Sequence, residues 1–296
     1  MKEELRAINA VAIVNVMSIA LYQRVSYDLS ELITKRYSTS FSLAVRLLEK
    51  EQRKAIYALY GFVRVADEIV DTFHGYDKIF LLDKLTEDLH YAINKGISTN
   101  PVLQAFAETI RRYNIDMAHI EAFLKSMRAD ISKNDYATAG EMNEYIYGSA
   151  DVVGLMCLQI FCDNNRELYD ELKEPAARLG SAFQKVNFLR DLRTDMAELK
   201  RSYFPEIEND ILTEDGRKKI EESIVEDFKE AHKGISGLPG RSRLAVLLAY
   251  TYYLKLLRKI QRTPSEQLMR QRIRIPDAAK YLIIVKVFFR YKLKIN

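Results

Sequence analysis

The chain has 296 residues, of which 48% are hydrophobic and 29% are charged, and its formal net charge is only +4. These values are typical of a folded protein with a sizeable core, and they exclude the disordered and low-complexity classes. The 11 glycines and 6 prolines amount to about half the usual combined frequency, which indicates few turns and predicts an all-α fold.

Residues 1–25 form an N-terminal extension that we expect to be an accessory helix, ahead of a main helical domain over 26–296. The extension is apolar but contains Asn9, Asn15 and Ser18, so it is too short and too polar for a membrane-spanning helix, and it lacks the cleavage site of a secretory signal. A helix is plausible over 26–35.

A hydroxyl cluster, Ser38-Thr-Ser40, lies between the first helix of the main domain and one predicted over 41–48. It either caps that helix or supplies hydroxyl donors at the mouth of a cavity.

The next helix, over 51–75, carries a polar stripe. Tyr60, Arg64, Asp67 and Asp71 follow +4, +3, +4 spacing, which places them on one helical face. Apolar residues surround the stripe, unlike the broad polar face of an ordinary surface helix. We therefore predict that it lines a cavity in which a cation offsets the repulsion between the two aspartates.

Three amphipathic helices follow, over 77–95, 101–113 and 116–133, and they carry no evident chemistry. A further helix is almost wholly apolar up to residue 161, which is typical of an interior helix. Its small central residues either allow close helix packing or leave volume for a ligand; they are Gly148, Ser149, Ala150 and Gly154.

A second polar stripe lies on a long helix predicted to begin at Pro175 and to end near Lys200. Its members, with +3, +4, +4 spacing, are Gln184, Asn187, Asp191 and Asp195. One acid pair at i, i+4 is a common pattern of solvated surfaces, but two pairs, each with an arginine close on its N-terminal side, favour a functional site. Beyond the stripe, Arg201 and Tyr203 either close over an anion or pack the turn.

A metal bound by these stripes would have oxygen ligands. The four histidines are scattered, and Cys157 and Cys162 lie in one helical segment, so the sequence favours neither a zinc site nor a disulfide framework, and it suits a reducing compartment. Paired aspartates with an asparagine suit Mg²⁺, which shares its coordination with phosphate oxygens. We therefore expect a phosphorylated substrate and, since no nucleic-acid-binding motif occurs, no nucleic-acid partner.

Two more helices are predicted over 218–233 and 241–262, and the C-terminal segment over 270–294 is both basic and strongly apolar. It is either a final core helix whose lysines reach solvent or a surface that rests on an anionic membrane. No stretch of 18 uncharged apolar residues occurs, so we expect no integral anchor.

Several segments together resemble the squalene/phytoene synthases. They are Ser38-Thr-Ser-Phe41, Ala58-Leu-Tyr-Gly-Phe-Val-Arg-Val-Ala-Asp-Glu-Ile-Val-Asp71, the second stripe with Arg190, and Arg201-Ser-Tyr-Phe-Pro205. The resemblance covers residues 26–290. It implies one all-α isoprenoid-synthase bundle around a central cavity, and head-to-head condensation of two prenyl diphosphates through a cyclopropylcarbinyl diphosphate.

The resemblance also implies roles for individual residues. The metal ligands, for Mg²⁺ or Mn²⁺, would be Asp67, Asp71, Asn187, Asp191 and Asp195. The catalytic set would be these four aspartates with Arg64, Arg190 and Tyr145, and the substrate-binding residues would be Ser38, Ser40, Phe41, Tyr60, Gln184, Tyr203 and Arg272. Two positions depart from the family pattern: Asp151 replaces a usual glycine, which could shorten the tunnel or reposition a tail, and Thr194 stands where an acid often precedes the last aspartate.

Within this family, the expected reaction joins two geranylgeranyl diphosphates to a C40 hydrocarbon of carotenoid biosynthesis without NADPH. The alternatives are a C30 product from two farnesyl diphosphates and a non-catalytic bundle that binds a lipid or a partner. We expect a cytoplasmic protein, for which the inner face of the membrane is a candidate site of peripheral contact. The sequence leaves the oligomeric state open.

Overall fold

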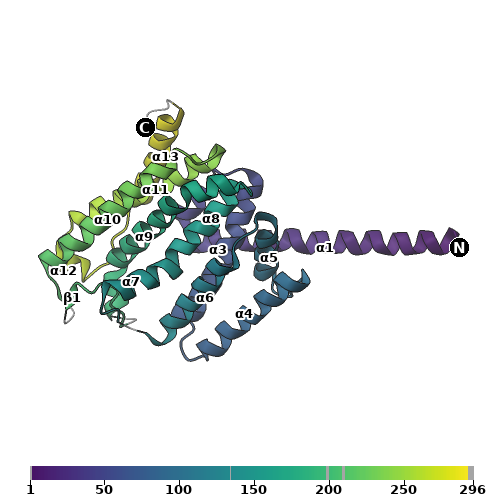
Figure 1. The fold of residues 1–296 in the computed structure, drawn as a ribbon, viewed down its shortest axis with the longest axis horizontal. Helices are drawn as coiled ribbons and strands as arrows, with labels where there is room; N and C mark the ends of the chain where they lie inside the picture. The colour runs from purple at the N-terminus through teal and green to yellow at the C-terminus, as the bar shows by residue number, and fades with distance from the viewer. Residues whose placement is uncertain (1, 134, 198–199, 209–210, 293–296) are drawn as a thin grey trace.

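Helices make up nearly all of the structure, which is a computed structural model (Figure 1). It describes residues 2–133, 135–197, 200–208 and 211–292. The helices in these ranges are α1 (Lys2–Tyr37), α2 (Thr39–Val45), α3 (Lys50–Asp71), α4 (Lys78–Lys95), α5 (Pro101–Tyr113), α6 (Met117–Ser132), α7 (Ala139–Ile146), the π-helix η1 (Tyr147–Asp151), α8 (Val152–Cys162), α9 (Arg166–Ala197), α10 (Glu214–Ile235), α11 (Gly240–Gln261), α12 (Ser265–Leu268) and α13 (Asp277–Lys292). Two short strands, β1 (Ile207–Glu208) and β2 (Ile211–Leu212), pair antiparallel with Ile207 opposite Leu212. The predicted all-α fold is confirmed.

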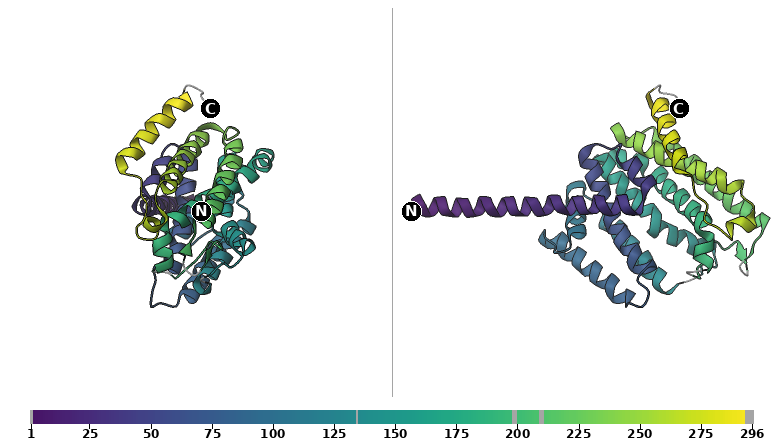
Figure 2. Two further views of the ribbon diagram at one scale, coloured as in Figure 1. Left: turned by 90° about the vertical axis from the view of Figure 1, so that its left-hand side faces the viewer. Right: turned by 180° about the vertical axis from the view of Figure 1, so that it is seen from behind.

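The predicted boundary after residue 25 falls inside α1, which is one continuous helix. Its N-terminal half projects from the bundle (Figures 1 and 2), whereas its C-terminal part packs on α3 and α5. Ser26, Ser30 and Thr34 are fully buried on this packed part, and each donates a hydrogen bond to the backbone carbonyl one turn earlier. Ser30 lies against Gly61 of α3, so short side chains let the two helices approach closely.

Side-chain caps fix where three of the predicted helices begin. Asp77, Asn100 and Asp116 each accept a hydrogen bond from a backbone N–H in the first turn of α4, α5 and α6. The predicted bounds of these helices therefore differ from the observed ones by at most one residue at each end.

The predicted interior helix consists of α7, η1 and α8 in succession. At η1 the Val152 N–H bonds to the Tyr147 carbonyl, five residues earlier, as in a π-helix. Residues Ala139–Cys162 are long and apolar enough to cross a membrane, with a mean hydropathy of 1.4, but 61% of the most apolar window is buried inside the bundle. This burial is the pattern of an interior helix.

The small residues of this helix serve both of the purposes that the sequence left open. A Cβ at Gly148 would lie 2.7 Å from the Ala122 carbonyl oxygen of α6, and one at Gly154 would lie 2.9 Å from the Ala176 carbonyl oxygen of α9. Ser149, Ala150 and Gly154 also line the central cavity. Close helix packing and open volume therefore coexist here.

Helix α9 begins at Arg166, so the predicted start at Pro175 is wrong. The side chain of Asn165 accepts a hydrogen bond from the Leu168 N–H and caps the helix. Pro175 lies inside α9 and packs against Gly234 of α10, where no Cβ would fit. A proline in a helix interior removes one backbone donor, but here it marks a close helix contact.

Two hydrophobic clusters form most of the core. One is centred on α3, α5 and α6, where the ring of Phe62 stacks on Phe106 and lies 5.5 Å from Phe123. The other joins α7 and α9 to α10 and α11. Residues of both clusters line the central cavity, so the cavity lies where the two clusters meet.

Candidate active site

The central cavity has a volume of about 610 Å³, and both polar stripes line it. The predicted site residues on its wall are Ser38, Phe41, Tyr60, Arg64, Asp67, Asp71, Tyr145, Gln184, Asn187, Arg190, Asp191, Asp195, Tyr203 and Arg272. Two runs more than a hundred residues apart in the sequence thus share one hollow.

Ser40 is the predicted site residue that does not line the cavity. The neighbouring Ser38 is the N-cap of α2, and its hydroxyl accepts a hydrogen bond from the Phe41 N–H. Phe41 lines the cavity, and Ser40 precedes it by one residue, which turns its side chain about 100° away on a helix. Ser38 therefore both caps α2 and lines the cavity, whereas Ser40 does not line it.

The first stripe is held by Arg64 on α3. Its guanidinium pairs with Glu68, lies 3.9 Å from an Asp67 carboxylate oxygen and sits 4.4 Å from the centre of the Tyr37 ring. The Nε of Arg64 is buried and has no hydrogen-bond partner in the described parts of the chain. This face of α3 therefore carries a guanidinium beside Asp67, the first of its two aspartates.

The second stripe is held by two arginines around Asp191. Arg190 donates to both carboxylate oxygens, at 3.0 and 2.5 Å, and the Nε of Arg272 lies 2.7 Å from one of them. Arg272 lies between α12 and α13, so the C-terminal segment reaches the cavity. Asn187 accepts a hydrogen bond from the Tyr253 hydroxyl at 3.2 Å, which orients its amide.

Arg201 connects the first stripe to α6. One nitrogen lies 2.8 Å from an Asp71 carboxylate oxygen, and another donates to the Asp130 carbonyl at 2.8 Å. The carboxylate of Asp130 accepts from the Tyr145 hydroxyl at 2.5 Å and from Tyr136 at 3.2 Å. Tyr145 is therefore positioned by a buried acid on a helix in which the sequence indicated no chemistry.

The sequence did contain a signal for Asp130. Ile120, Phe123 and Met127 form the buried face of α6, and Asp130 continues their +3, +4, +3 spacing. An acid on the apolar face of a helix needs a partner or a function.

Burial and the charges of neighbouring acids make two of the stripe aspartates, Asp67 and Asp195, hard to ionise. Burial, together with the charge of Asp71, raises the pKa of Asp67 to about 7, although Arg64 opposes the shift. Burial and the charges of Asp191 and Asp71 raise the pKa of Asp195 to about 7. Because Asp71 acts on Asp195, the two stripes face each other at electrostatic range, and a cation between them would lower both pKa values.

Aromatic rings cover much of the wall beside the acids. Phe41 stacks on Tyr60 with their centroids 4.9 Å apart, Phe188 stacks on Tyr203 at 4.0 Å, and Tyr203 stacks on Tyr145 at 5.3 Å. Burial raises the pKa of Tyr60 to about 12, so its hydroxyl stays protonated at neutral pH. Farther along, the lining is apolar and includes Val153, Leu158, Phe161, Leu172 and Leu179. The cavity thus has a charged end and an apolar end.

Asp151 lies outside the cavity wall, which argues against the expectation that it shortens the tunnel. Its carboxylate accepts a hydrogen bond from the Ser181 hydroxyl of α9 at 2.7 Å. Burial raises the pKa of Asp151 to about 7, and Ser181 and Lys185 oppose the shift. The side chain therefore belongs to the packing between η1 and α9.

The stripes offer oxygen ligands that fit a divalent cation shared with a phosphorylated substrate. In the parts of the chain that the structure describes, no three His, Cys, Asp or Glu side chains come close enough to hold a metal alone. Mg²⁺ is usually bound by one or two carboxylates plus phosphate oxygens. Each i, i+4 aspartate pair supplies such a partial set, and Asn187 adds an amide oxygen.

Known structures share this fold. A dehydrosqualene synthase in complex with a ligand superimposes with a TM-score of 0.79 at 22% identity, over 91% of this chain and 98% of that one. The squalene synthase HpnC from Alicyclobacillus acidocaldarius gives a TM-score of 0.72 at 24% identity, over 82% and 95%.

Comparison by sequence finds relatives of the same kind, together with a family model. A phytoene synthase of Arthrospira platensis is 30% identical over an alignment of 285 positions, and the match covers 88% of this chain and 91% of the relative. The chloroplastic phytoene synthase 1 of Solanum lycopersicum is 29% identical over 80% of this chain, which spans 61% of that relative's length. The family model described as squalene/phytoene synthase matches residues 34–278. The chain therefore belongs to the squalene/phytoene synthase family.

Proposed function

We propose that this protein is a phytoene synthase, which condenses two geranylgeranyl diphosphates head to head, through a cyclopropylcarbinyl diphosphate, to a C40 hydrocarbon. The observation that carries the proposal is the cavity with two facing aspartate stripes at one end and an apolar wall at the other. The phytoene synthases among the sequence relatives support the C20 substrate.

We assign Mg²⁺ binding to Asp67 and Asp71 on one wall and to Asn187, Asp191 and Asp195 on the other, with Mn²⁺ as a substitute that accepts the same ligands. When bound, the metal would neutralise the diphosphate that leaves as the allylic C–O bond breaks. Oxygen donors suit this task because they are the ligands that hard cations prefer.

The arginines and aromatic residues of the chain have complementary tasks. Arg64, Arg190 and Arg272 line the charged end and would bind diphosphate oxygens through charge-assisted hydrogen bonds. After ionisation, the C–O electron pair stays on the diphosphate and a carbocation remains. The rings of Phe41 and Tyr60 would then exclude water and face the cation with π-electrons. The stacked rings of Tyr145, Tyr203 and Phe188 would do the same. No side-chain nucleophile is needed.

The metal assignment is tested by Asp67→Ala and Asp191→Ala. Each variant should lose Mg²⁺-dependent product formation while its far-ultraviolet circular dichroism stays unchanged. Asp88→Ala removes an acid on α4 that pairs with Lys84 at 2.9 Å and does not line the cavity, and it serves as the control, with full activity expected. Near-normal turnover by either stripe variant would refute the assignment.

The choice of substrate is tested by product analysis. Purified protein receives farnesyl or geranylgeranyl diphosphate with Mg²⁺, with and without NADPH, and the hydrocarbon is identified by mass spectrometry. A C40 product made without NADPH supports the proposal. A C30 product, squalene or dehydrosqualene, would assign the protein to the other branch of the family.

A further inference from the structure

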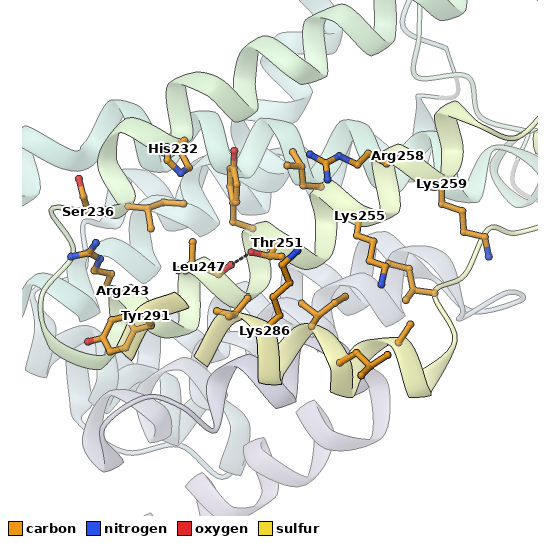
Figure 3. A pocket seen from close by; sticks show the side chains of 18 of the residues that line it. His232, Ser236, Arg243, Leu247, Thr251, Lys255, Arg258, Lys259, Lys286 and Tyr291 are labelled. Carbon is orange, nitrogen blue, oxygen red and sulfur yellow. Dashed lines mark hydrogen bonds between the residues drawn. The ribbon is translucent and has the colours of Figure 1, made fainter. Parts of the chain in front are cut away.

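A second hollow, larger than the central cavity, lies on the outside of the bundle between α10, α11 and α13 (Figure 3). Its volume is about 1480 Å³, and none of its lining residues belongs to the predicted site. We call it the α11–α13 groove. The proposed reaction makes no use of it.

The groove concentrates positive charge. Of the side chains that the structure describes, seven lysines and arginines line it together with His232, and no aspartate or glutamate does. The cations come from three elements, and Figure 3 labels Arg243, Lys255, Arg258, Lys259 and Lys286 around the hollow. For Arg243, Lys255, Arg258 and Lys286, no carboxylate partner occurs among the described residues. An anion would therefore meet several uncompensated positive charges.

The floor and the outer edge of the groove are apolar. Leu247 and Leu254 of α11 face Ile283 and Val287 of α13. On the outer side of α13, Leu282, Val285 and Phe289 are 68%, 52% and 60% exposed. Helix α13 is therefore apolar toward the bundle and also toward solvent, and it stands at the edge of the molecule (Figure 2). An ordinary surface helix would be polar on its outer side.

An exposed apolar ridge beside a cluster of cations is the chemistry of a protein that lies on an anionic bilayer. Phosphate headgroups would bind in the groove, and the ridge of Leu282, Val285 and Phe289 would enter the acyl layer. An acidic peptide or a nucleic acid would use the cations but would leave the ridge in water. The ridge therefore favours the membrane.

The groove is also close to the apolar end of the central cavity. Ile235 of α10 lines both hollows. Helix α11 separates them, with Val246, Ala249 and Tyr253 on the cavity side and Leu247 and Leu254 on the groove side. A membrane docked on the groove would thus lie one helix away from the apolar wall.

We propose that the α11–α13 groove binds anionic phospholipid headgroups and docks the protein, with the apolar ridge of α13 inserted, on a membrane surface. The docking itself does not depend on the reaction. Docking would bring a water-insoluble hydrocarbon product close to a membrane, and this benefit rests on the proposed function.

The test is co-sedimentation of the full chain with vesicles of phosphatidylcholine alone or with about a third phosphatidylglycerol, at low and high salt. The wild type should bind the anionic vesicles at least about tenfold more tightly than the neutral ones, and salt should weaken binding because it screens the charges. Equal binding to both vesicles, or none to either, would overturn the proposal.

Two pairs of charge reversals separate the groove from overall charge. Lys255→Glu with Arg258→Glu changes the groove, and Lys84→Glu with Lys95→Glu changes α4, which lies far from α13 (Figure 1). Both pairs lower the formal net charge from +4 by the same amount. The groove pair should weaken binding at least about tenfold, since each basic residue near an anionic surface contributes about 1 kcal/mol; the α4 pair should not. Equal losses would show that net charge, not the groove, binds the vesicles.

The ridge is tested by Leu282→Ser with Phe289→Ser, which should also weaken vesicle binding severalfold while circular dichroism stays unchanged. Unchanged vesicle binding by this variant would overturn insertion of α13, as would equally tight binding of the wild type to soluble polyglutamate. Hydrocarbon synthesis in detergent is measured in parallel. Its failure in the wild type would refute the proposed function without affecting the docking result.

Discussion

Asp151 provides a test of the electrostatics because its charge lies in a helix contact and not in the cavity. The rise of its pKa from 3.8 to about 7 means that the folded state binds the proton more tightly than the unfolded state. The contribution of Asp151 to the free energy of unfolding should therefore fall as pH rises from about 4 to 7 and stay low above that range. The full rise corresponds to about 4 kcal/mol at 1.36 kcal/mol for each pH unit. Solvent at this partly exposed site should reduce the cost to ~2 kcal/mol.

Asp151→Asn keeps an oxygen that can accept from Ser181 but carries no charge at any pH. Urea unfolding should show the variant more stable than the wild type by ~2 kcal/mol at pH 8 and by less than ~1 kcal/mol at pH 5. The groups that act on this carboxylate are Ser181, Asp227, Lys185 and Arg178, and none changes in the variant. Asp88→Asn on α4 controls for the loss of one negative charge. An equal gain at both pH values, or a less stable variant at pH 8, would refute the reasoning. The length of the hydrocarbon product should not change.

Two further substitutions test the packing around the site. Arg201→Met removes the donors to Asp71 and to the buried Asp130 carbonyl and should cost about 2–3 kcal/mol of unfolding free energy in urea; a variant as stable as the wild type would contradict the network. Gly180→Ala places a Cβ 2.7 Å from the carbonyl oxygen of Ala150 and should cost about 1–3 kcal/mol in thermal unfolding. In Gly140→Ala the nearest atom is 3.8 Å away, so no loss is expected, and equal losses in both alanine variants would refute the contact.

The acid stripes could be predicted because α3 and α9 are regular helices over the residues concerned. On such a helix, sequence spacing alone decides which side chains share a face. The surrounding apolar residues then showed that each polar face is covered. What the spacing could not supply was the pairing of the arginines, since Arg272 reaches Asp191 from a segment 81 residues farther along the chain.

Arg201 illustrates a contact that no local pattern predicts. It lies in the loop after α9, where its N–H bonds to the Asp195 carbonyl. The next residue, Ser202, forms a parallel bridge with Asp135, and its carbonyl accepts from the Tyr136 N–H. This pairing joins the loops after α9 and α6 and brings Arg201 to Asp130. Two loops without periodicity carry no signal of their pairing, so the sequence left the role of Arg201 open.

The π-helix explains why the side of the helix on which Asp151 lies could not be predicted. Tyr145, Ser149, Val153, Cys157 and Phe161 all line the cavity, in four steps of four residues. In a regular α-helix each such step turns the side chain about 40° past a full turn, so the last residue would lie far around the helix from the first. The wider turn at η1 offsets part of this rotation and keeps these five side chains on the cavity side. Asp151 ends that turn and points to Ser181 of α9, which places its charge in the helix contact where the pH test applies.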